Sequence, residues 1–253
     1  MKIEIIRCLE DNYSYLLIDE ESNYACVIDP SESKPIINYT EKNRINLKFI
    51  LNTHHHFDHI GGNKDLKKKY NSKVIGFKKD KNRIPEIDIA LDDKEIWKNN
   101  KFEAKIYHIP GHTSGHVCYH FFNQNILFTG DTLFSLGCGR IFEGTYEMMF
   151  KSLNIFKNFP LETKIYCGHE YTLQNSKFCI KYDKNNSNLK KKIESINDKL
   201  NKGLPSIPST IKDELECNIF LRSENKSIQK NLNLNNINSL QTFSKLRDLK
   251  DNF

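Results

Sequence analysis

The segment NTHHHFDHIGG, residues 52–62, directly follows the apolar run 47–51 and holds four histidines and an aspartate within six positions. On an extended segment His54 and His56 would share one face, while His55 would point to the other face. Neutral imidazole nitrogens suit zinc, iron or manganese ions. The segment therefore predicts a metal site at the end of a buried strand.

The residues behind these histidines extend the predicted site. Asp58 and His59 follow at once, and the pair Gly61 and Gly62 would assist a sharp chain turn there. Such a turn would direct the Asp58 carboxylate and the His59 imidazole toward a second ion beside the first. The combination HxHxDH with a strand before it and two glycines after it is far more specific than an isolated HxH.

A site for two ions needs ligands from other parts of the chain. His112 in IPGHTSGHV, Asp131 in ILFTGDTLF and His169 in IYCGHEY each follow a strand-like run. Ligands gathered at several strand ends form a rigid, open cluster, and a carboxylate can bridge two cations. We expect His54, His56 and His112 on one ion, Asp58, His59 and His169 on the other, and Asp131 shared.

The remaining histidines are expected to play other roles. His55 should face away from the cluster or form a local hydrogen bond, and His116 should pack beside the ligands or support them. His108 and His120 lie in strand-like runs, where structural roles are expected. Asp29 in VIDP suits either support of a ligand or an ordinary turn aspartate.

The predicted ions indicate hydrolysis. Divalent cations lower the pKa of a bound water from roughly 15.7 to about 7, so a hydroxide held by both ions is the expected nucleophile. Asp58 and His59 would take part through this hydroxide, and the ions would stabilise the oxyanion. Cys138 in LGCGR is the covalent alternative, but no histidine base flanks it and a structural role is favoured.

The chain has 253 residues and 38% hydrophobic content, which is adequate for a core. Short strand-like runs continue to about residue 170, and the pattern is helical afterwards. This predicts an α+β domain at 1–170 and a smaller helical domain at 171–253. Helices are expected near 33–43, 62–70, 145–158, 173–184, 186–203 and 239–251, and a loop at 230–238.

Composition limits the compartment and the partners. The seven cysteines are scattered without a CxxC pair, which favours free thiols and a reducing cytoplasmic setting. The opening residues alternate like a strand, and no run of 18 apolar residues occurs. The net charge of +6 comes from solvated lysine clusters without interleaved aromatics. We expect a monomer without a nucleic-acid or membrane partner.

The motifs THHHFDH, GHTSGH, GDTLF and GHEY, in this order, resemble those of the metallo-β-lactamase superfamily. The resemblance implies an αββα sandwich, here followed by a smaller C-terminal α-helical domain. The stretches DNYSYLLID, TLFSLGCGRIFEGT, CGHEYT, CNIFLR and LRDLKDNF resemble the hydroxyacylglutathione hydrolase, or glyoxalase II, family over nearly the whole chain. That resemblance implies hydrolysis of S-(2-hydroxyacyl)glutathione thioesters, typically S-D-lactoylglutathione to D-lactate and glutathione, in methylglyoxal detoxification.

The same resemblance implies two divalent ions, zinc with iron or manganese as alternatives, on the ligands already deduced. It adds glutathione contacts at Arg140, Tyr171, Arg247 and Lys250. Cationic side chains would hold the glutathione carboxylates while the thioester reaches the metal-activated water. Phe142 stands where the family commonly has a tyrosine, so one hydroxyl contact in this substrate-binding region would be missing.

Three other functions compete with this one. A sulfur dioxygenase of the superfamily would use one iron and glutathione persulfide, but such proteins lack the long helical extension. An RNA-processing nuclease would suit the positive charge, but no separate RNA-binding arm is found. A non-catalytic binding module would have eroded ligands, whereas all seven are present.

Overall fold

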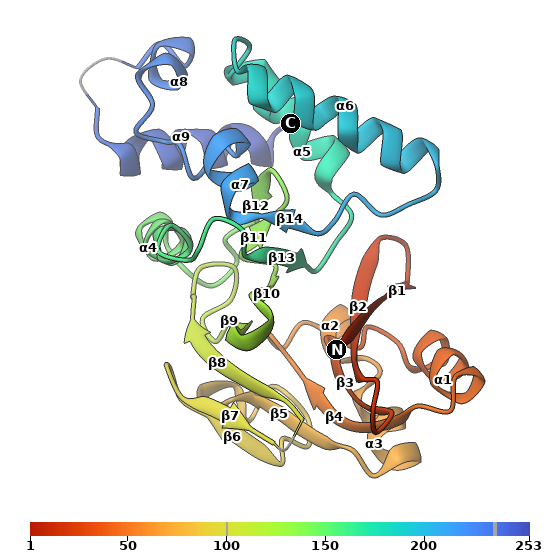
Figure 1. Ribbon diagram of the computed structural model, residues 1–253. Coiled ribbons are helices and arrows are strands. Elements are labelled where there is room, and N and C mark those ends of the chain that lie inside the picture. Colours follow the sequence, from red (N-terminus) through yellow and green to blue (C-terminus); the bar gives the residue numbers. More distant parts are fainter. Residues whose placement is uncertain (100, 235–236) are drawn as a thin grey trace. The chain divides into compact units, whose positions relative to one another are not determined.

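The computed structural model describes residues 1–99, 101–234 and 237–253 (Figure 1). Its chain forms two compact units. Unit 1 consists of Met1–His108, Gly115–Gln124 and Phe128–Gly130, and unit 2 consists of Ile109–Ser114, Asn125–Leu127 and Asp131–Phe253.

Unit 1 is built on a six-stranded sheet with the strand order β1-β2-β3-β4-β5-β6. The strands are β1 (Lys2–Cys8), β2 (Asn12–Asp19), β3 (Tyr24–Ile28), β4 (Asn46–Leu51), β5 (Lys73–Phe77) and β6 (Ile89–Leu91). The first three strands pair antiparallel, and β3 to β6 pair parallel. Ile28 lies opposite Leu51, so the loops after β3 and β4 leave the sheet side by side.

Both faces of this sheet are covered. Helices α1 (Ser33–Lys42) and α3 (Asn63–Tyr70) pack on one face, where Ile36 and Leu66 join a core of buried aliphatic side chains. A short helix, α2 (Phe57–Ile60), precedes α3. On the other face the rings of Tyr15 and Phe128 lie 5.2 Å apart, and those of Phe49 and Trp97 lie 5.0 Å apart. The two faces explain why β2 is buried over nearly its whole length.

The second sheet has the strand order β14-β13-β10-β9-β8-β7. Its strands within unit 1 are β7 (Ile96–Lys98), β8 (Glu103–His108), β9 (Val117–Phe121) and the end of β10 (Ile126–Gly130). Tyr119 in β9 donates a hydrogen bond from its hydroxyl to the carbonyl of Asn52, which follows β4. This bond is buried and ties the second sheet to the loop that carries the histidine segment.

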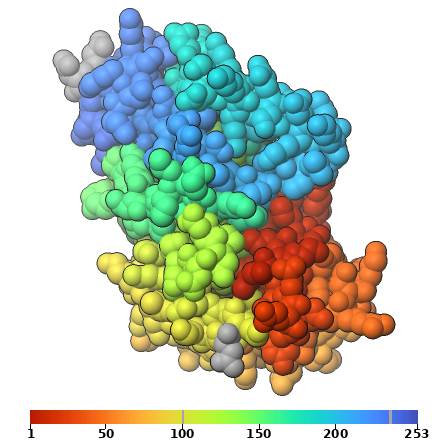
Figure 2. Space-filling model, in the orientation of Figure 1, coloured from red at the N-terminus to blue at the C-terminus, as the bar shows by residue number. Residues whose placement is uncertain are grey.

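Unit 2 combines short strands with most of the helices. It contains the hairpin β11 (Leu133–Phe134) and β12 (Gly137–Cys138), α4 (Tyr146–Phe156), β13 (Lys164–Cys167), α5 (Thr172–Tyr182), α6 (Ser187–Asn201), β14 (Ser209–Thr210), α7 (Ile211–Cys217), α8 (Lys226–Asn231) and α9 (Ser239–Asp251). Helix α6 packs on α5 and α7, and its outer side, coloured cyan to light blue, forms much of the visible surface of this unit (Figure 2).

Side-chain caps define the starts of several of these helices. The hydroxyl of Thr145 accepts from Met148 N at α4, and the Asn186 side chain accepts from Leu189 N at α6. Asn238 and Gln241 form a complete capping box at α9. The expected helices near 145–158, 186–203 and 239–251 are confirmed within a few residues.

The structure also corrects the expected pattern. Residues 230–231 end helix α8 instead of belonging to a loop, while 235–236 lie outside the described residues. The short elements β5, β6, β7, α7 and α8 carry too few turns or alternations to be recognised from the pattern. Within the described residues, no helix combines the length and the apolar character that crossing a membrane requires.

All seven cysteines are free thiols, and all are buried. Burial raises the pKa of the Cys167, Cys179 and Cys217 thiols to about 12, and it raises those of Cys26 and Cys118 further. Thiolates are therefore scarce at neutral pH.

Candidate metal centre

The histidine segment follows β4 and continues into α2. His54 and His59 are buried, and their ring centroids lie 4.1 Å apart. The ring of His56 lies 4.7 Å from that of His54. One short stretch of chain thus gathers three imidazoles, as the spacing predicts.

Asp29 holds this segment in place from the end of β3. Its Oδ1 accepts from Thr53 N at 2.7 Å, and its Oδ2 accepts from the Thr53 hydroxyl at 2.6 Å. The same Oδ2 lies 3.0 Å from His59 Nδ1. These contacts agree with the expected role of Asp29 as support of a ligand and not with that of an ordinary turn aspartate. Such supporting carboxylates orient metal-binding imidazoles.

These contacts also assign the ring hydrogens. A carboxylate only accepts, so His59 Nδ1 carries the hydrogen and the lone pair is on Nε2, 3.6 Å from Asp58 Oδ2. The Thr53 hydroxyl donates its hydrogen to Asp29, so it accepts a hydrogen bond from His54 Nδ1 at 3.0 Å. The lone pair of His54 then also falls on Nε2, the form in which imidazole binds a metal.

Amide side chains that the sequence pattern did not single out support the segment as well. Asn12 donates to both the backbone oxygen and Oδ2 of Asp58, at 3.1 and 3.0 Å. Asn52 and Asn63 bond reciprocally at 3.2 and 2.8 Å, and Asn52 also donates to the backbone oxygen of His59. The only sequence signal for Asn12 is its place in the stretch DNYSYLLID.

In unit 2 the three predicted ligands converge. Asp131 Oδ2 lies 3.2 Å from His169 Nε2 and 3.6 Å from His112 Nε2. His112 Nδ1 lies 2.8 Å from the backbone oxygen of Arg140, which fixes the hydrogen on Nδ1 and the lone pair on Nε2. The His169 ring stacks on Tyr171 at 4.7 Å. Asp131 is thus placed to share a cation with either imidazole.

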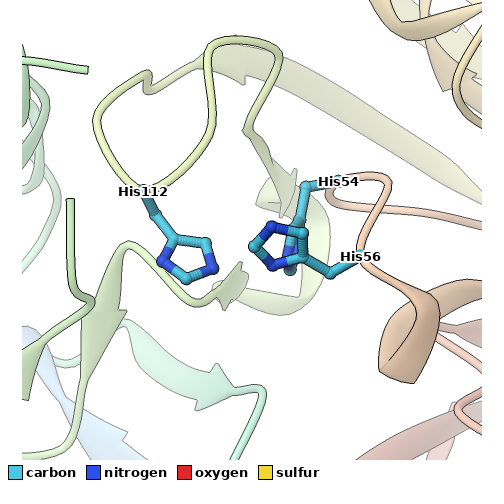
Figure 3. A group of neighbouring side chains, drawn as sticks. All are labelled: His54, His56 and His112. Atoms are coloured by element: carbon cyan, nitrogen blue, oxygen red, sulfur yellow. The ribbon is translucent and has the colours of Figure 1, made fainter. Parts of the chain in front are cut away.

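Three groups among the described residues have ligand atoms within 4.8 Å of one another. They are His54 with His56 and His112, Asp58 with His59 and His169, and Asp29 with His54 and His59. Figure 3 shows the first group, whose rings turn toward a common point. Asp29 already accepts from three donors, so its hydrogen bonds are those expected of a supporting carboxylate. The neutral nitrogens and carboxylates of the first two groups fit divalent cations.

The other histidines lie as expected. His116 is buried and stacks on His54 at 4.6 Å, so it packs beside the ligands. His55 Nδ1 lies 3.4 Å from the buried carboxylate of Asp80. His108 stacks on Phe77, and His120 lies in β9, where burial lowers its pKa.

The predicted glutathione contacts in unit 2 differ in exposure. The side chain of Arg140 is 63% exposed and Phe142 is 63% exposed, with the Phe142 ring 5.2 Å from His112. Arg247 is only 2% exposed and donates from Nη1 to the Cys138 carbonyl at 2.7 Å. Lys250 lies over the ring of Phe178, and burial, followed by the charge of Arg247, lowers its pKa.

Comparison with known proteins supports the same picture. The model of the metallo-β-lactamase superfamily matches residues 10–169, and the model of the hydroxyacylglutathione hydrolase C-terminus matches residues 170–253. The hydroxyacylglutathione hydrolase of Pelagibacter ubique is 63% identical over the full length of both chains. That of Methylococcus capsulatus is 40% identical over 100% of this chain and 99% of its own.

Solved structures are similar in fold at low identity. The BLEG-1 B3 metallo-β-lactamase has a TM-score of 0.68 at 21% identity, covering 87% of this chain and 99% of its own. ETHE1 from Myxococcus xanthus has a TM-score of 0.67 at 22% identity, covering 99% and 100%.

The fold and the histidine and aspartate groups define a metal-binding protein of the metallo-β-lactamase superfamily, with its αββα sandwich and an added C-terminal helical region. Within that superfamily, the two model matches and the full-length relatives place the chain in one branch. The chain belongs to the hydroxyacylglutathione hydrolase family, the glyoxalase II enzymes.

Proposed function

We propose that this chain hydrolyses S-(2-hydroxyacyl)glutathione thioesters, typically S-D-lactoylglutathione, to the hydroxy acid and glutathione. The observation that carries the proposal is the convergence of oriented ligands. Asp29 and Thr53 fix the imidazoles of unit 1, and His112 and His169 meet at Asp131 in unit 2. Oriented ligands of this kind suit hydrolysis, because catalysis requires groups held in position before the reaction.

We assign two divalent cations to seven residues. His54, His56 and His112 would hold one, Asp58, His59 and His169 the other, and Asp131 both; zinc is the first choice, with iron or manganese as alternatives. Cations bound there would supply Lewis acidity, which brings the pKa of water to about 7 and polarises a carbonyl.

The chain's own residues hold the protons and would orient the substrate. Asp29 and the Arg140 carbonyl keep the ring hydrogens of His59 and His112 on Nδ1, so that neither imidazole rotates or changes tautomer. We assign Arg140, Lys250 and Arg247 to the carboxylates of glutathione, and Tyr171 and Phe142 to its peptide. A substrate anchored at one end presents its thioester in one geometry.

Further parts of the proposal concern organisation and setting. We assign catalysis to residues 1–170 and glutathione binding to residues 171–253, together with Arg140 and Phe142. Seven free, buried thiols support a reducing compartment, and we propose the cytoplasm. We also propose that the enzyme acts as a monomer.

The test is an assay of the purified, folded protein whose metal content is known from elemental analysis. We expect loss of the S-D-lactoylglutathione thioester with release of one thiol. Treatment with a chelator should abolish the activity, and zinc, iron or manganese should restore it. A fully metallated sample that leaves the thioester intact, yet consumes oxygen with glutathione persulfide, would overturn the proposal.

A further inference from the structure

The hairpin β11–β12 in unit 2 is held by a buried carboxylate that has no part in the metal centre. Leu136 at its tip adopts a positive φ of 59°, which is uncommon for a residue other than glycine. The backbone N–H of Leu136 donates to Glu214 Oε2 at 2.8 Å. Glu214 lies in α7 and is fully buried. The carboxyl group of Glu214 therefore accepts a hydrogen bond from a backbone amide in a turn with positive φ.

Neighbouring helix side chains complete this attachment. Asn218, also in α7, donates from Nδ2 to the Gly137 carbonyl at 3.0 Å and to Glu214 Oε2 at 2.9 Å. Asn175 in α5 donates to the Ser135 carbonyl at 3.1 Å. Three consecutive residues of the hairpin are thus bonded to helices. Helices α5 and α7 therefore define the position of the hairpin through hydrogen bonds, which have strict geometry.

The same hairpin leads directly to Arg140. The carbonyl of Cys138 accepts from Arg247, and the carbonyl of Arg140 lies against His112 Nδ1. The Arg140 guanidinium is exposed, with Nε 3.6 Å from Asp251 Oδ1. A shift of the hairpin tip would therefore move the residue whose side chain we assign to the substrate.

We propose that Glu214 is a positioning residue for substrate binding, which holds the β11–β12 hairpin through Leu136 and thereby places Arg140 against a carboxylate of the glutathione half. The inference rests on the proposed function, because it needs a glutathione thioester as substrate. It concerns substrate binding and not the metal ligands, since the hydrogen bonds of the Glu214 carboxylate go to Leu136, Ser209 and Asn218. Its signature is an effect on KM.

The surroundings of Glu214 indicate that an acceptor oxygen matters more than the charge. Its Oε1 bonds the Ser209 hydroxyl, and Lys192 in α6 acts on it only through its charge. The thiols of Cys167, Cys179 and Cys217 also face it. Burial raises the pKa of the Glu214 carboxyl to about 7. A glutamine could keep the oxygen toward Leu136 and donate its amide hydrogens to Ser209.

The experiment compares the kinetics of Glu214→Ala, Glu214→Gln, Arg140→Ala and the double variant Glu214→Ala/Arg140→Ala with S-D-lactoylglutathione. Glu214→Ala should raise KM about tenfold, the equivalent of roughly one hydrogen bond, with kcat within twofold. Glu214→Gln should have about the same KM as the wild type. Because Glu214 acts through Arg140, adding Glu214→Ala to Arg140→Ala should raise KM no further.

Glu216→Ala is the matched control, because Glu216 lies in the same helix but bonds Asn188 at the surface. It should leave KM unchanged. If Glu214→Ala does not fold, Glu214→Asp keeps the charge, withdraws the oxygens from Leu136 and should raise KM severalfold. Thermal melts and metal analysis accompany every variant.

The outcomes separate the two proposals. An inactive, metallated wild type would overturn the proposed function and this inference with it. An active wild type in which the Glu214→Ala and Arg140→Ala effects multiply independently, or in which Glu214→Gln fails to restore KM, would overturn this inference alone.

Discussion

Asp29 shows how one side chain can orient candidate metal ligands through its hydrogen bonds. It stands at positive φ, at the point where β3 ends, and its two oxygens accept from Thr53 and His59. The parallel pairing of β3 with β4 brings Asp29 beside Thr53, so the sheet register itself makes the contact possible. The supporting residue and the ligand segment are therefore joined by the fold.

Replacement of Asp29 by asparagine should release metal. An asparagine has one acceptor oxygen, so at least one of the three donors now bonded to Asp29 would lose its acceptor. Changes of this kind typically cost about 10- to 100-fold in metal affinity. Metal retained after dialysis against a chelator measures the effect. Asp65→Asn on the exposed side of α3 is the control, and equal metal retention in both variants would contradict the role of Asp29.

Phe142 gives a second prediction at this scale. Its ring is exposed beside His112, at the position where the family resemblance of the sequence implies a tyrosine. Phe142→Tyr should lower KM for S-D-lactoylglutathione severalfold with unchanged kcat, because an added hydroxyl bonds the peptide part of the substrate without touching the reacting atoms. Steady-state kinetics measure this, and an unchanged KM would show that the hydroxyl has no partner.

The candidate metal ligands are the part of the site that the sequence predicts best. The motif HxHxDH contains four candidate ligands. The rings of His56 and His59 lie 4.7 and 4.1 Å from that of His54, and Asp58 Oδ2 lies 3.6 Å from His59 Nε2. Their supports are harder to predict. Asp29 could equally have been a turn residue, while Asn12 and Glu214 gain their roles from contacts with residues 46 and 78 positions away. Such pairings depend on strand register and helix packing, which local patterns do not contain.

At the scale of elements, α9 carries two of the predicted substrate contacts in different settings. Arg247 is buried and bonds the Cys138 carbonyl and Asp251, whereas Lys250 is partly exposed. Arg247 thus packs against Cys138 at the end of β12, whereas Lys250, one turn further along the helix, reaches solvent. The two cations should therefore respond differently to truncation.

Lys250→Ala should raise KM for S-D-lactoylglutathione with little change in kcat or Tm, because it removes uniform binding from a partly exposed cation. Arg247→Ala should raise KM and also lower Tm by several degrees, since it leaves the Cys138 carbonyl without a buried donor. Kinetics and thermal melts on both variants measure the difference. Lys245→Ala, on the exposed side of the same helix, serves as the control. Equal Tm values for both variants would contradict the structural role of Arg247.

Long, capped helices were predictable, and short elements were not. The 13-residue helix α9 begins at a capping box, and its expected limits of 239 and 251 are those observed. Strand β5 was not predicted because Gly76 interrupts its apolar run. A Cβ at this position would lie 2.9 Å from the terminal methyl of Ile87, so that side chain would have to shift. Helices α7 and α8 have only 7 and 6 residues, and tertiary contacts stabilise them.

For the whole molecule, Glu214 predicts a pH-dependent stability. Its pKa rises from 4.5 to about 7 on folding, so the folded chain binds the proton more tightly than the unfolded chain. The stabilisation is complete below about pH 4.5 and is lost as the pH rises through 7. At ~1.4 kcal/mol per pKa unit, the loss is about 3 kcal/mol at most.

The measurement is the free energy of unfolding at pH 5 and pH 8 for the wild type and for Glu214→Gln. The wild type should lose roughly 2–3 kcal/mol more than the variant across this range, because glutamine does not titrate and part of the full effect is already lost at pH 5. Other titrating groups are common to both chains and cancel in the difference. Parallel pH profiles would contradict the assignment.

Because all seven thiols are buried, the folded chain should react only slowly with sulfhydryl reagents. A chromogenic disulfide added to a reaction would colour only with glutathione liberated from the thioester, without a background from the catalyst. With denaturant present, the same reagent would react with each cysteine that unfolding exposes. One reagent therefore measures both thioester hydrolysis and unfolding of the core.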